Sequence, residues 1–154
     1  MLKAGDKAPA VELPSAEMKM QTVADHQGSH NVVLYFYPKD DTPGCTMESL
    51  EFTDLMDEFH ELDTVVIGIS KDTCISHAAF RDKYGLTMQL LADVDGKACE
   101  DYGVWQEKIK GDERKMGIVR STFIIDKQGV IGHALYQVKP KGHGELILDL
   151  VRAL

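Results

Sequence analysis

Long apolar runs are missing from this sequence. A membrane-spanning helix needs roughly 18–20 consecutive apolar residues, and every apolar run here is much shorter. The N-terminal residues Met-Leu-Lys-Ala-Gly-Asp-Lys also lack the apolar stretch of a secretory signal. We therefore expect a cytoplasmic protein that does not act at a membrane.

Positive charge is scarce as well. Lys and Arg number 17 against 25 Asp and Glu, which gives a formal net charge of −8. Such a surface repels phosphate backbones and anionic lipid headgroups. We expect neither a nucleic-acid partner nor a membrane partner.

Cysteine is sparse and odd in number, with only Cys45, Cys74 and Cys99. This count argues against the disulfide framework of a small secreted scaffold. The spacing Cys74-x-x-His77 is the one hint of a metal pair, and the other histidines show no spacing typical of zinc sites. We predict no metal site, so the question is whether any of the three thiols is reactive.

What is present fits one domain over residues 1–154. About 44% of the residues are apolar and 27% are charged, as in ordinary globular domains. Short runs rich in β-branched and aromatic residues predict strands. These strands are residues 32–37, 64–69, 88–92, 121–126 and 130–136, preceded by a weaker hairpin signal at 11–13 and 19–23.

Four helices are predicted between and after these strands. The first follows residue 42, with Phe52, Leu55, Met56 and Phe59 at i, i+3, i+4, i+7 on its buried stripe. The acidic residues of this helix should then turn largely to water, namely Glu48, Glu51, Asp54, Asp57 and Glu58. The others end near Gly85, cover residues 95–102 and close the chain around Leu150.

The order of these elements predicts the fold class. A strand, helix, strand unit with strands buried on both faces implies a right-handed parallel crossover. Together with the closing hairpin and helix, it is typical of an α/β thioredoxin-like fold, with a central mixed sheet flanked by helices and an N-terminal β-hairpin extension. Ligands of such sheets bind at the carboxyl ends of the parallel strands, which draws attention to the segment after residue 37.

That segment contains Cys45. Thr42 followed by Pro43 is typical of an N-cap and the first helical residue, which makes Gly44 the second and Cys45 the third. The first helical turn offers unpaired N–H groups and the positive end of the helix dipole, so a sulfur held there is stabilised as the thiolate. The alternative is a structural cysteine, since free cysteines are often buried. The Thr-Pro-Gly-Cys context after a buried strand favours a reactive thiol.

The same segment resembles the active-site motif of the peroxiredoxins. Pro38-x-x-x-Thr42-x-x-Cys45 matches the general motif, and the longer string Tyr37 to Glu48 resembles the peroxiredoxin Q subfamily, also called bacterioferritin comigratory protein. Further matches cover nearly the whole chain: Gly5-Asp6-x-Ala8-Pro9, Ser76-His77-x-x-Phe80, Tyr102-Gly103-Val104-Trp105 and Arg120-Ser121-Thr122-Phe123.

This resemblance implies roles for individual residues. Cys45 matches the peroxidatic cysteine, Thr42 the threonine that hydrogen-bonds the peroxide, Pro38 the proline that shields the sulfur, and Arg120 the arginine that supports the thiolate. Gly44 lets a small substrate approach the backbone closely. For Glu48 two interpretations stay open: a bond to Arg120 or a neighbouring segment, or a solvated first-turn acid.

The residue that resolves the oxidised sulfur is left open. In one branch of the subfamily it lies five residues after the peroxidatic cysteine, where this chain has Leu50. In other members it lies on the following helix, near Arg81 here, so the resemblance does not support Cys74. Cys74, Cys99 and an external thiol remain candidates, because a disulfide needs Cα atoms within about 7 Å.

The resemblance implies a peroxidase without metal, haem or flavin. It would reduce hydrogen peroxide and small organic hydroperoxides, oxidise Cys45 to a sulfenic acid, and be recycled by thioredoxin or a similar dithiol. Monomer and homodimer are both open. The rival hypotheses are a thiol–disulfide oxidoreductase, disfavoured because Cys-x-x-Cys is absent, and a non-catalytic binding or chaperone module.

Overall fold

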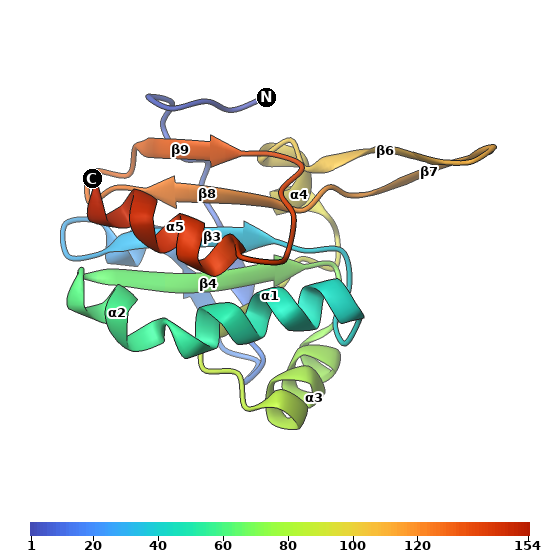
Figure 1. Ribbon diagram of the computed structural model, residues 1–154, viewed down its shortest axis with the longest axis horizontal. Coiled ribbons are helices and arrows are strands. Elements are labelled where there is room, and N and C mark those ends of the chain that lie inside the picture. The colour runs from blue at the N-terminus through green and yellow to red at the C-terminus, as the bar shows by residue number, and fades with distance from the viewer.

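A five-stranded mixed sheet forms the centre of the computed structural model, which describes all residues 1–154 (Figure 1). The strand order is β5-β4-β3-β8-β9. The strands are β3 (Asn31–Phe36), β4 (Thr64–Ser70), β5 (Gln89–Ala92), β8 (Ser121–Ile125) and β9 (Ile131–Leu135). β3, β4 and β5 run parallel, whereas β8 is antiparallel to β3 and β9 is antiparallel to β8. The predicted fold class is confirmed.

Alternate residues of β3 face two separate cores, as the two-residue period of a strand requires. Val32, Leu34 and Phe36 belong to the core closed by the N-terminal segment, η1 (Val23–His26) and α4 (Lys97–Asp101). Val33 and Tyr35 belong to the core under the other helices, which are α1 (Pro43–Asp54), α2 (Met56–Glu61), α3 (Cys74–Tyr84) and α5 (His143–Arg152). Both faces of the sheet are covered, which is why its strands are continuous apolar runs in the sequence.

The helix predicted after residue 42 is in fact two helices. α1 ends at Asp54, and Leu55, with φ −100° and ψ 6°, separates it from α2. The apolar stripe runs across the break, because Phe52, Met56 and Phe59 are all buried in the same core. Continuous periodicity therefore concealed the boundary.

Two small hairpins flank the central sheet. The predicted N-terminal hairpin is present as antiparallel β1 (Glu12–Pro14) and β2 (Met20–Thr22). A second hairpin, β6 (Trp105–Lys110) and β7 (Glu113–Ile118), was not predicted and projects away from the body in Figure 1. Its residues from Glu107 to Met116 are exposed, so they lack the apolar alternation that marks a half-buried strand.

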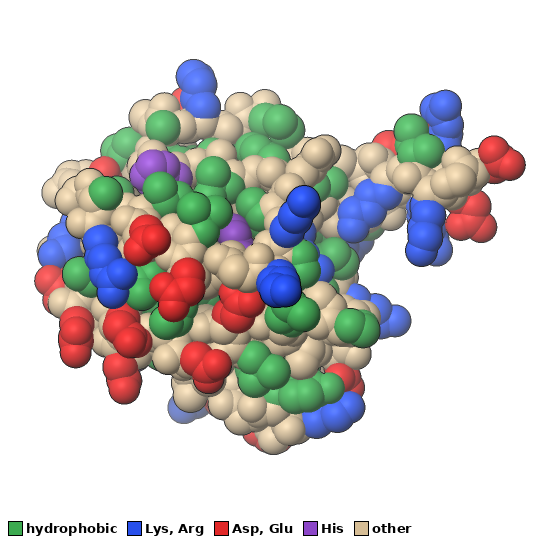
Figure 2. Space-filling model, in the orientation of Figure 1, with side chains coloured by type: hydrophobic (Ala, Val, Ile, Leu, Met, Phe, Trp, Pro, Cys, Tyr) green, Lys and Arg blue, Asp and Glu red, His purple; other side chains and the backbone are tan.

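Charge is unevenly spread over the visible face. In Figure 2, acidic side chains gather over α1, α2 and α5, whereas blue side chains are prominent on the projecting hairpin. The hairpin contributes four cations, Lys108, Lys110, Arg114 and Lys115. None of the helices is long and apolar enough to cross a bilayer.

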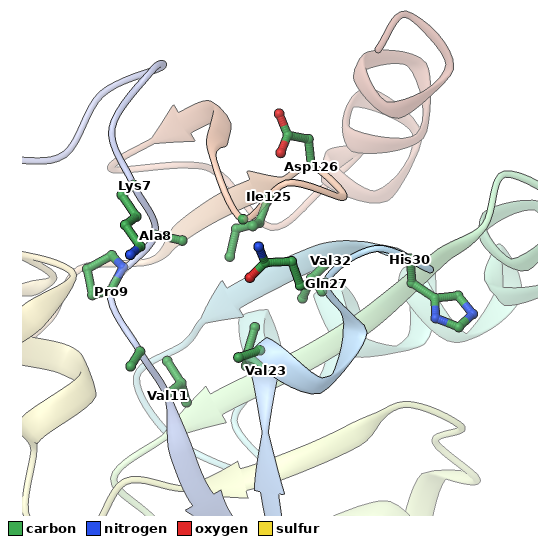
Figure 3. Close-up of a pocket in the computed structure, with 13 residues that line it drawn as sticks. Lys7, Ala8, Pro9, Val11, Val23, Gln27, His30, Val32, Ile125 and Asp126 are labelled. Atoms are coloured by element: carbon green, nitrogen blue, oxygen red, sulfur yellow. The ribbon is translucent and has the colours of Figure 1, made fainter.

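A hollow of about 490 Å³ lies at the amino end of β3 (Figure 3). Val11, Val23, Val32 and Ile125 contribute its apolar walls. Cys45 follows the carboxyl end of β3, so this hollow and the predicted site lie at opposite ends of the sheet. The site must therefore be sought in the contacts around Cys45.

Candidate active site

The first turn of α1 holds Cys45 as the sequence predicted. Thr42 is the N-cap, with extended backbone at φ −106° and ψ 155°, and Pro43 is the first helical residue. The Thr42 hydroxyl makes no capping bond and instead donates to the carbonyl oxygen of Lys39 at 2.8 Å. Cys45 is 1% exposed, so the sulfur lies at the helix N-terminus and away from bulk water.

Arg120 reaches this turn from the other half of the chain. It directly precedes β8, whose first residue, Ser121, pairs with Phe36 at the end of β3. The guanidinium Nη2 donates to Cys45 Sγ at 3.3 Å. A Cβ added at Gly44 would lie 3.1 Å from that Nη2, which is closer than most neighbours tolerate. Gly44 thus leaves the space through which Arg120 approaches the sulfur.

The Arg120 charge is secured on its other side by Glu48. Nη1 donates to Glu48 Oε1 at 2.7 Å. Burial opposes the charge of the guanidinium, but the acidic partners Glu48 and Cys45 prevail and raise the pKa of Arg120. The permanently charged guanidinium therefore binds the Glu48 carboxylate through Nη1 and the Cys45 sulfur through Nη2.

Glu48 corrects one sequence prediction and decides another. The helical pattern turned it to water, yet its side chain is fully buried. Of its two open interpretations, the bond to Arg120 is the one present and the solvated acid is wrong. Burial raises its pKa to about 7, against the opposing effect of Arg120. The carboxyl lies inward, where it accepts from Arg120, the residue directly before β8.

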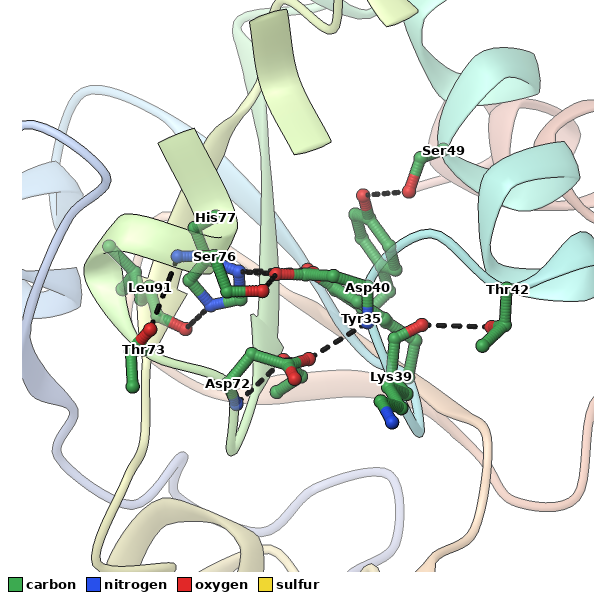
Figure 4. Close-up of polar contacts among 12 residues, drawn as sticks. Tyr35, Lys39, Asp40, Thr42, Ser49, Asp72, Thr73, Ser76, His77 and Leu91 are labelled. Atoms are coloured by element: carbon green, nitrogen blue, oxygen red, sulfur yellow. Dashed lines mark hydrogen bonds and ion pairs between the residues drawn. The ribbon is translucent and has the colours of Figure 1, made fainter. Parts of the chain in front are cut away.

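Asp40, which the sequence analysis did not single out, is the centre of a buried network (Figure 4). Its carboxylate accepts from Tyr37 Oη at 2.5 Å and Ser76 Oγ at 2.8 Å, and lies 2.7 Å from His77 Nδ1. His77 Nε2 lies 2.9 Å from the carbonyl oxygen of Leu91, an acceptor, so Nε2 carries a hydrogen. A further proton lies between Nδ1 and Asp40, since two bare acceptors would repel each other.

This network fastens the loop before α1 to α3. Asp41 adds two exposed contacts, from Lys83 Nζ at 2.8 Å and Tyr84 Oη at 2.6 Å. Pro38, which the motif assigns to the sulfur's shield, is half-buried at the start of the same loop. The resemblance strings contain Asp40 and His77, but only the fold brings their side chains together.

The other two cysteines differ in their surroundings. Cys74 is the first residue of α3 and is half-buried, and Thr73 caps this helix by accepting from Ser76 N at 3.1 Å. Cys99 is fully buried on α4, and burial, with Asp93 beside it, raises the pKa of its thiol far above the usual range. All three thiols are unpaired. Packing is therefore the role that the surroundings of Cys99 favour.

The geometry agrees with comparisons with known proteins. The model of the AhpC/TSA family matches residues 4–134. The putative peroxiredoxin bcp of Coxiella burnetii is 44% identical over 142 residues, covering 92% of this chain and 93% of the relative. Peroxiredoxin Bcp of Bacillus subtilis is 42% identical over 142 residues, covering 92% and 90%.

Solved structures give the same answer. The Xylella fastidiosa PrxQ structure superposes with a TM-score of 0.93 at 36% identity, covering 99% of this chain and 97% of that one. The Xanthomonas campestris bacterioferritin comigratory protein superposes with a TM-score of 0.88 at 36% identity, covering 93% and 90%. This chain therefore belongs to the AhpC/TSA family and, within it, to the Bcp/PrxQ peroxiredoxins, which are thiol-dependent peroxidases.

Proposed function

We propose that this protein reduces hydrogen peroxide and small organic hydroperoxides through the Cys45 thiolate. The sulfur attacks the terminal peroxide oxygen, an S–O bond forms and the O–O bond breaks. The departing hydroxide or alkoxide takes a proton from water, which leaves water or an alcohol and a Cys45 sulfenic acid. The observation that carries this proposal is the 3.3 Å contact between Arg120 Nη2 and Cys45 Sγ in the first turn of α1.

Arg120 and Thr42 would interact with different parts of the peroxide. The guanidinium stabilises the thiolate first and then the negative charge that develops on the departing oxygen. The Thr42 hydroxyl donates its hydrogen to the carbonyl oxygen of Lys39. The hydroxyl oxygen therefore keeps lone pairs that accept the hydrogen of a hydroperoxide. Pro38 shields the sulfur from water, and Gly44, which has no side chain, keeps the approach to the sulfur and to Arg120 open.

The substrate class is supported by one relative and by burial. The Xanthomonas campestris relative is described by its alkyl peroxide reduction activity. This activity supports organic hydroperoxides as substrates, in addition to the hydrogen peroxide that we propose. Because Cys45 is only 1% exposed, we propose that substrates with a small group next to the O–O bond react fastest.

For recycling we propose a one-cysteine mechanism, in which an external dithiol protein such as thioredoxin reduces the sulfenic acid. Leu50 occupies the position of one family resolver, and Arg81, near the other, is paired with Glu17 at 2.8 Å and Asp82 at 3.0 Å. Cys99 is enclosed. The sparse, unpaired cysteines fit a reducing compartment such as the cytoplasm.

The test of the first step is competition kinetics, in which the protein and a reporter peroxidase compete for a limited amount of hydrogen peroxide or cumene hydroperoxide. Cys45→Ser should abolish peroxide consumption, while Cys74→Ser and Cys99→Ala, as matched thiol controls, retain it. An unchanged rate in Cys45→Ser refutes the proposal. It would also leave room for the oxidoreductase and binding-module alternatives.

The test of recycling is a separate experiment. Peroxide-treated protein is separated on a non-reducing gel and mapped by mass spectrometry. Sulfenic or sulfinic Cys45 without a crosslink supports the one-cysteine mechanism. A Cys45–Cys74 disulfide would replace it with an intramolecular one.

A further inference from the structure

One face of the β6–β7 hairpin carries three lysines. In the antiparallel register Lys108 lies opposite Lys115, and Lys110 lies opposite Glu113. Residues directly opposite each other share a face, so two like charges are neighbours at the centre of this face, which destabilises a strand pair. The three lysines are exposed, and none forms an ion pair with a carboxylate. The stability of the hairpin therefore does not explain why they are here.

The other face of the hairpin differs in kind. There Glu107 is bound by Arg114 at 3.4 Å, and the Lys71 ammonium lies 4.1 Å from the centre of the Trp105 ring. The exposed apolar residues Ile109 and Met116 are also on that face. The lysine-bearing face presents positive charge and almost no apolar surface, so a molecule that binds it is recognised by charge.

This lysine-bearing face begins close to the reactive sulfur. β7 ends at Ile118, two residues before Arg120, whose guanidinium touches Cys45 Sγ. The Lys108 side chain lies along Gly117, with Cδ 3.2 Å from where a Cβ would be, and so extends towards the base of the hairpin. Burial and the Arg120 charge lower the pKa of Lys108, against the opposing effect of Cys45. The positive face is therefore continuous with the active site.

Unpaired lysines also approach the sulfur from other elements. Lys139 and Lys141 flank Pro140, whose Cγ is 3.4 Å from where a Cβ of Gly44 would be. Lys39 is exposed in the loop between β3 and α1. Figure 2 shows blue side chains over the loop that enters α5 and along the hairpin. Together these residues form the lysine cluster, which consists of Lys39, Lys108, Lys110, Lys115, Lys139 and Lys141 and contains no ion pair.

The position of the cluster indicates which molecule it attracts. In a chain of net charge −8, cations gathered around one sulfur favour the approach of an anion to that sulfur. Two molecules must reach Cys45, the peroxide and the reductant. A hydroperoxide is uncharged at neutral pH and too small to touch Cys45 and the projecting hairpin together (Figure 1). A protein reductant is large enough to contact both.

We propose that the lysine cluster is the docking surface for the dithiol protein that reduces oxidised Cys45, and that this partner binds through an acidic face around its reactive thiol. The inference rests on the proposed recycling by an external dithiol protein. One partner thiolate attacks the sulfenic sulfur, an S–S bond forms, and the released hydroxide takes a proton to become water. The second partner thiol loses its proton and displaces Cys45 as a thiolate, so the partner leaves as a disulfide.

Turnover of hydrogen peroxide with two reductants tests the docking surface. One is a bacterial thioredoxin of net negative charge, regenerated by NADPH and thioredoxin reductase, and the other is dithiothreitol, an uncharged dithiol. The readout is the ratio of their kcat/KM values at saturating peroxide, in which a change in the reactivity of Cys45 cancels. At about 0.1 M salt, Lys110→Glu combined with Lys115→Glu should lower this ratio at least about fivefold. Raising the salt to about 1 M should remove most of the difference.

The matched control makes the same change in net charge at the other end of the sheet. Lys7 lines the hollow at the amino end of β3, and Lys127 follows β8 at that end. Lys7→Glu combined with Lys127→Glu should change the ratio less than about twofold, because these positions are screened from the docking surface. An equal loss in both double variants, or no loss in the hairpin variant, overturns the inference.

Two further outcomes would also overturn it. One is turnover with dithiothreitol but none with thioredoxin. The other is an equal loss in the hairpin variant with glutathione, a small anionic thiol, since the lysines would then attract any anion without docking a protein. Failure of the peroxidase proposal is distinguishable from these results, because the unmodified protein would then consume no peroxide with either reductant.

Discussion

Glu48 and His143 have opposite effects on how the free energy of unfolding changes with pH. Replacing either one should therefore uncover a pH dependence that is cancelled while both are present. Glu48 has its pKa raised from about 4.5 to about 7 by burial. Its contribution to folding is therefore fully present below pH 4.5 and is lost as the pH rises towards 7. His143 has its pKa lowered from about 6.5 to about 4. Its contribution is fully present above pH 6.5 and is lost as the pH falls towards 4.

The magnitudes follow from the same values. One pKa unit corresponds to about 1.4 kcal/mol, so each group changes the free energy of unfolding by roughly 3 kcal/mol across its range, and in opposite directions. Between pH 4.5 and 6.5 the two slopes cancel. Folding in this interval only moves a proton from the imidazole of the unfolded chain to the carboxyl of the folded one.

Urea unfolding at pH 4.5, 5.5 and 6.5 is the assay. In Glu48→Gln the free energy of unfolding should rise by about 2–3 kcal/mol from pH 4.5 to 6.5, relative to the unmodified protein, because only the His143 slope remains. In His143→Phe it should fall by a similar amount. Exposed acids such as Asp6 and Asp41 titrate equally in all three proteins and cancel in the comparison. If the free energy of unfolding changed with pH in the same way in all three proteins, the opposite pKa shifts of Glu48 and His143 would be refuted.

Three further predictions concern the site itself. Arg120→Lys keeps the charge but loses the fork, so the peroxide rate in competition kinetics should fall about 10- to 100-fold, as expected for one charged hydrogen bond; a loss under about threefold contradicts the role of the guanidinium. Thr42→Val should lower the same rate at least about tenfold and Thr42→Ser far less, and equal losses would show that the hydroxyl is not used. Asp40→Asn leaves His77 and Ser76 short of an acceptor and should lower the free energy of unfolding by about 2–4 kcal/mol; calorimetry that finds no change in Tm would remove Asp40 from the centre of its network.

The parts of the site that the sequence predicts are those set by neighbouring residues. Thr42, Pro43 and Cys45 lie within one turn, so capping rules alone place the sulfur at the helix N-terminus. Arg120 is 75 residues away and was assigned by its resemblance to a family motif. The strand pairing of Ser121 with Phe36 explains why that motif lies next to the helix.

The parts that escaped prediction depend on tertiary contacts. A glutamate within a run of helical acids looks solvated, and only the tertiary structure shows that Glu48 is buried and meets Arg120, a residue 72 positions away. The network around Asp40 joins two loops and a helix that no local pattern connects. The β6–β7 hairpin was not predicted for the opposite reason, since its residues are exposed on both faces and leave no periodic apolar signal in the sequence.

The enclosure of Cys99 makes it a reporter of opening. A thiol reagent added to the folded protein meets no accessible sulfur on α4, so alkylation at this position counts only those molecules in which the helix has come away from the sheet. Brief exposure to such a reagent at increasing denaturant, followed by peptide mapping, would record the unfolding of the domain from one atom, without a label or an engineered site.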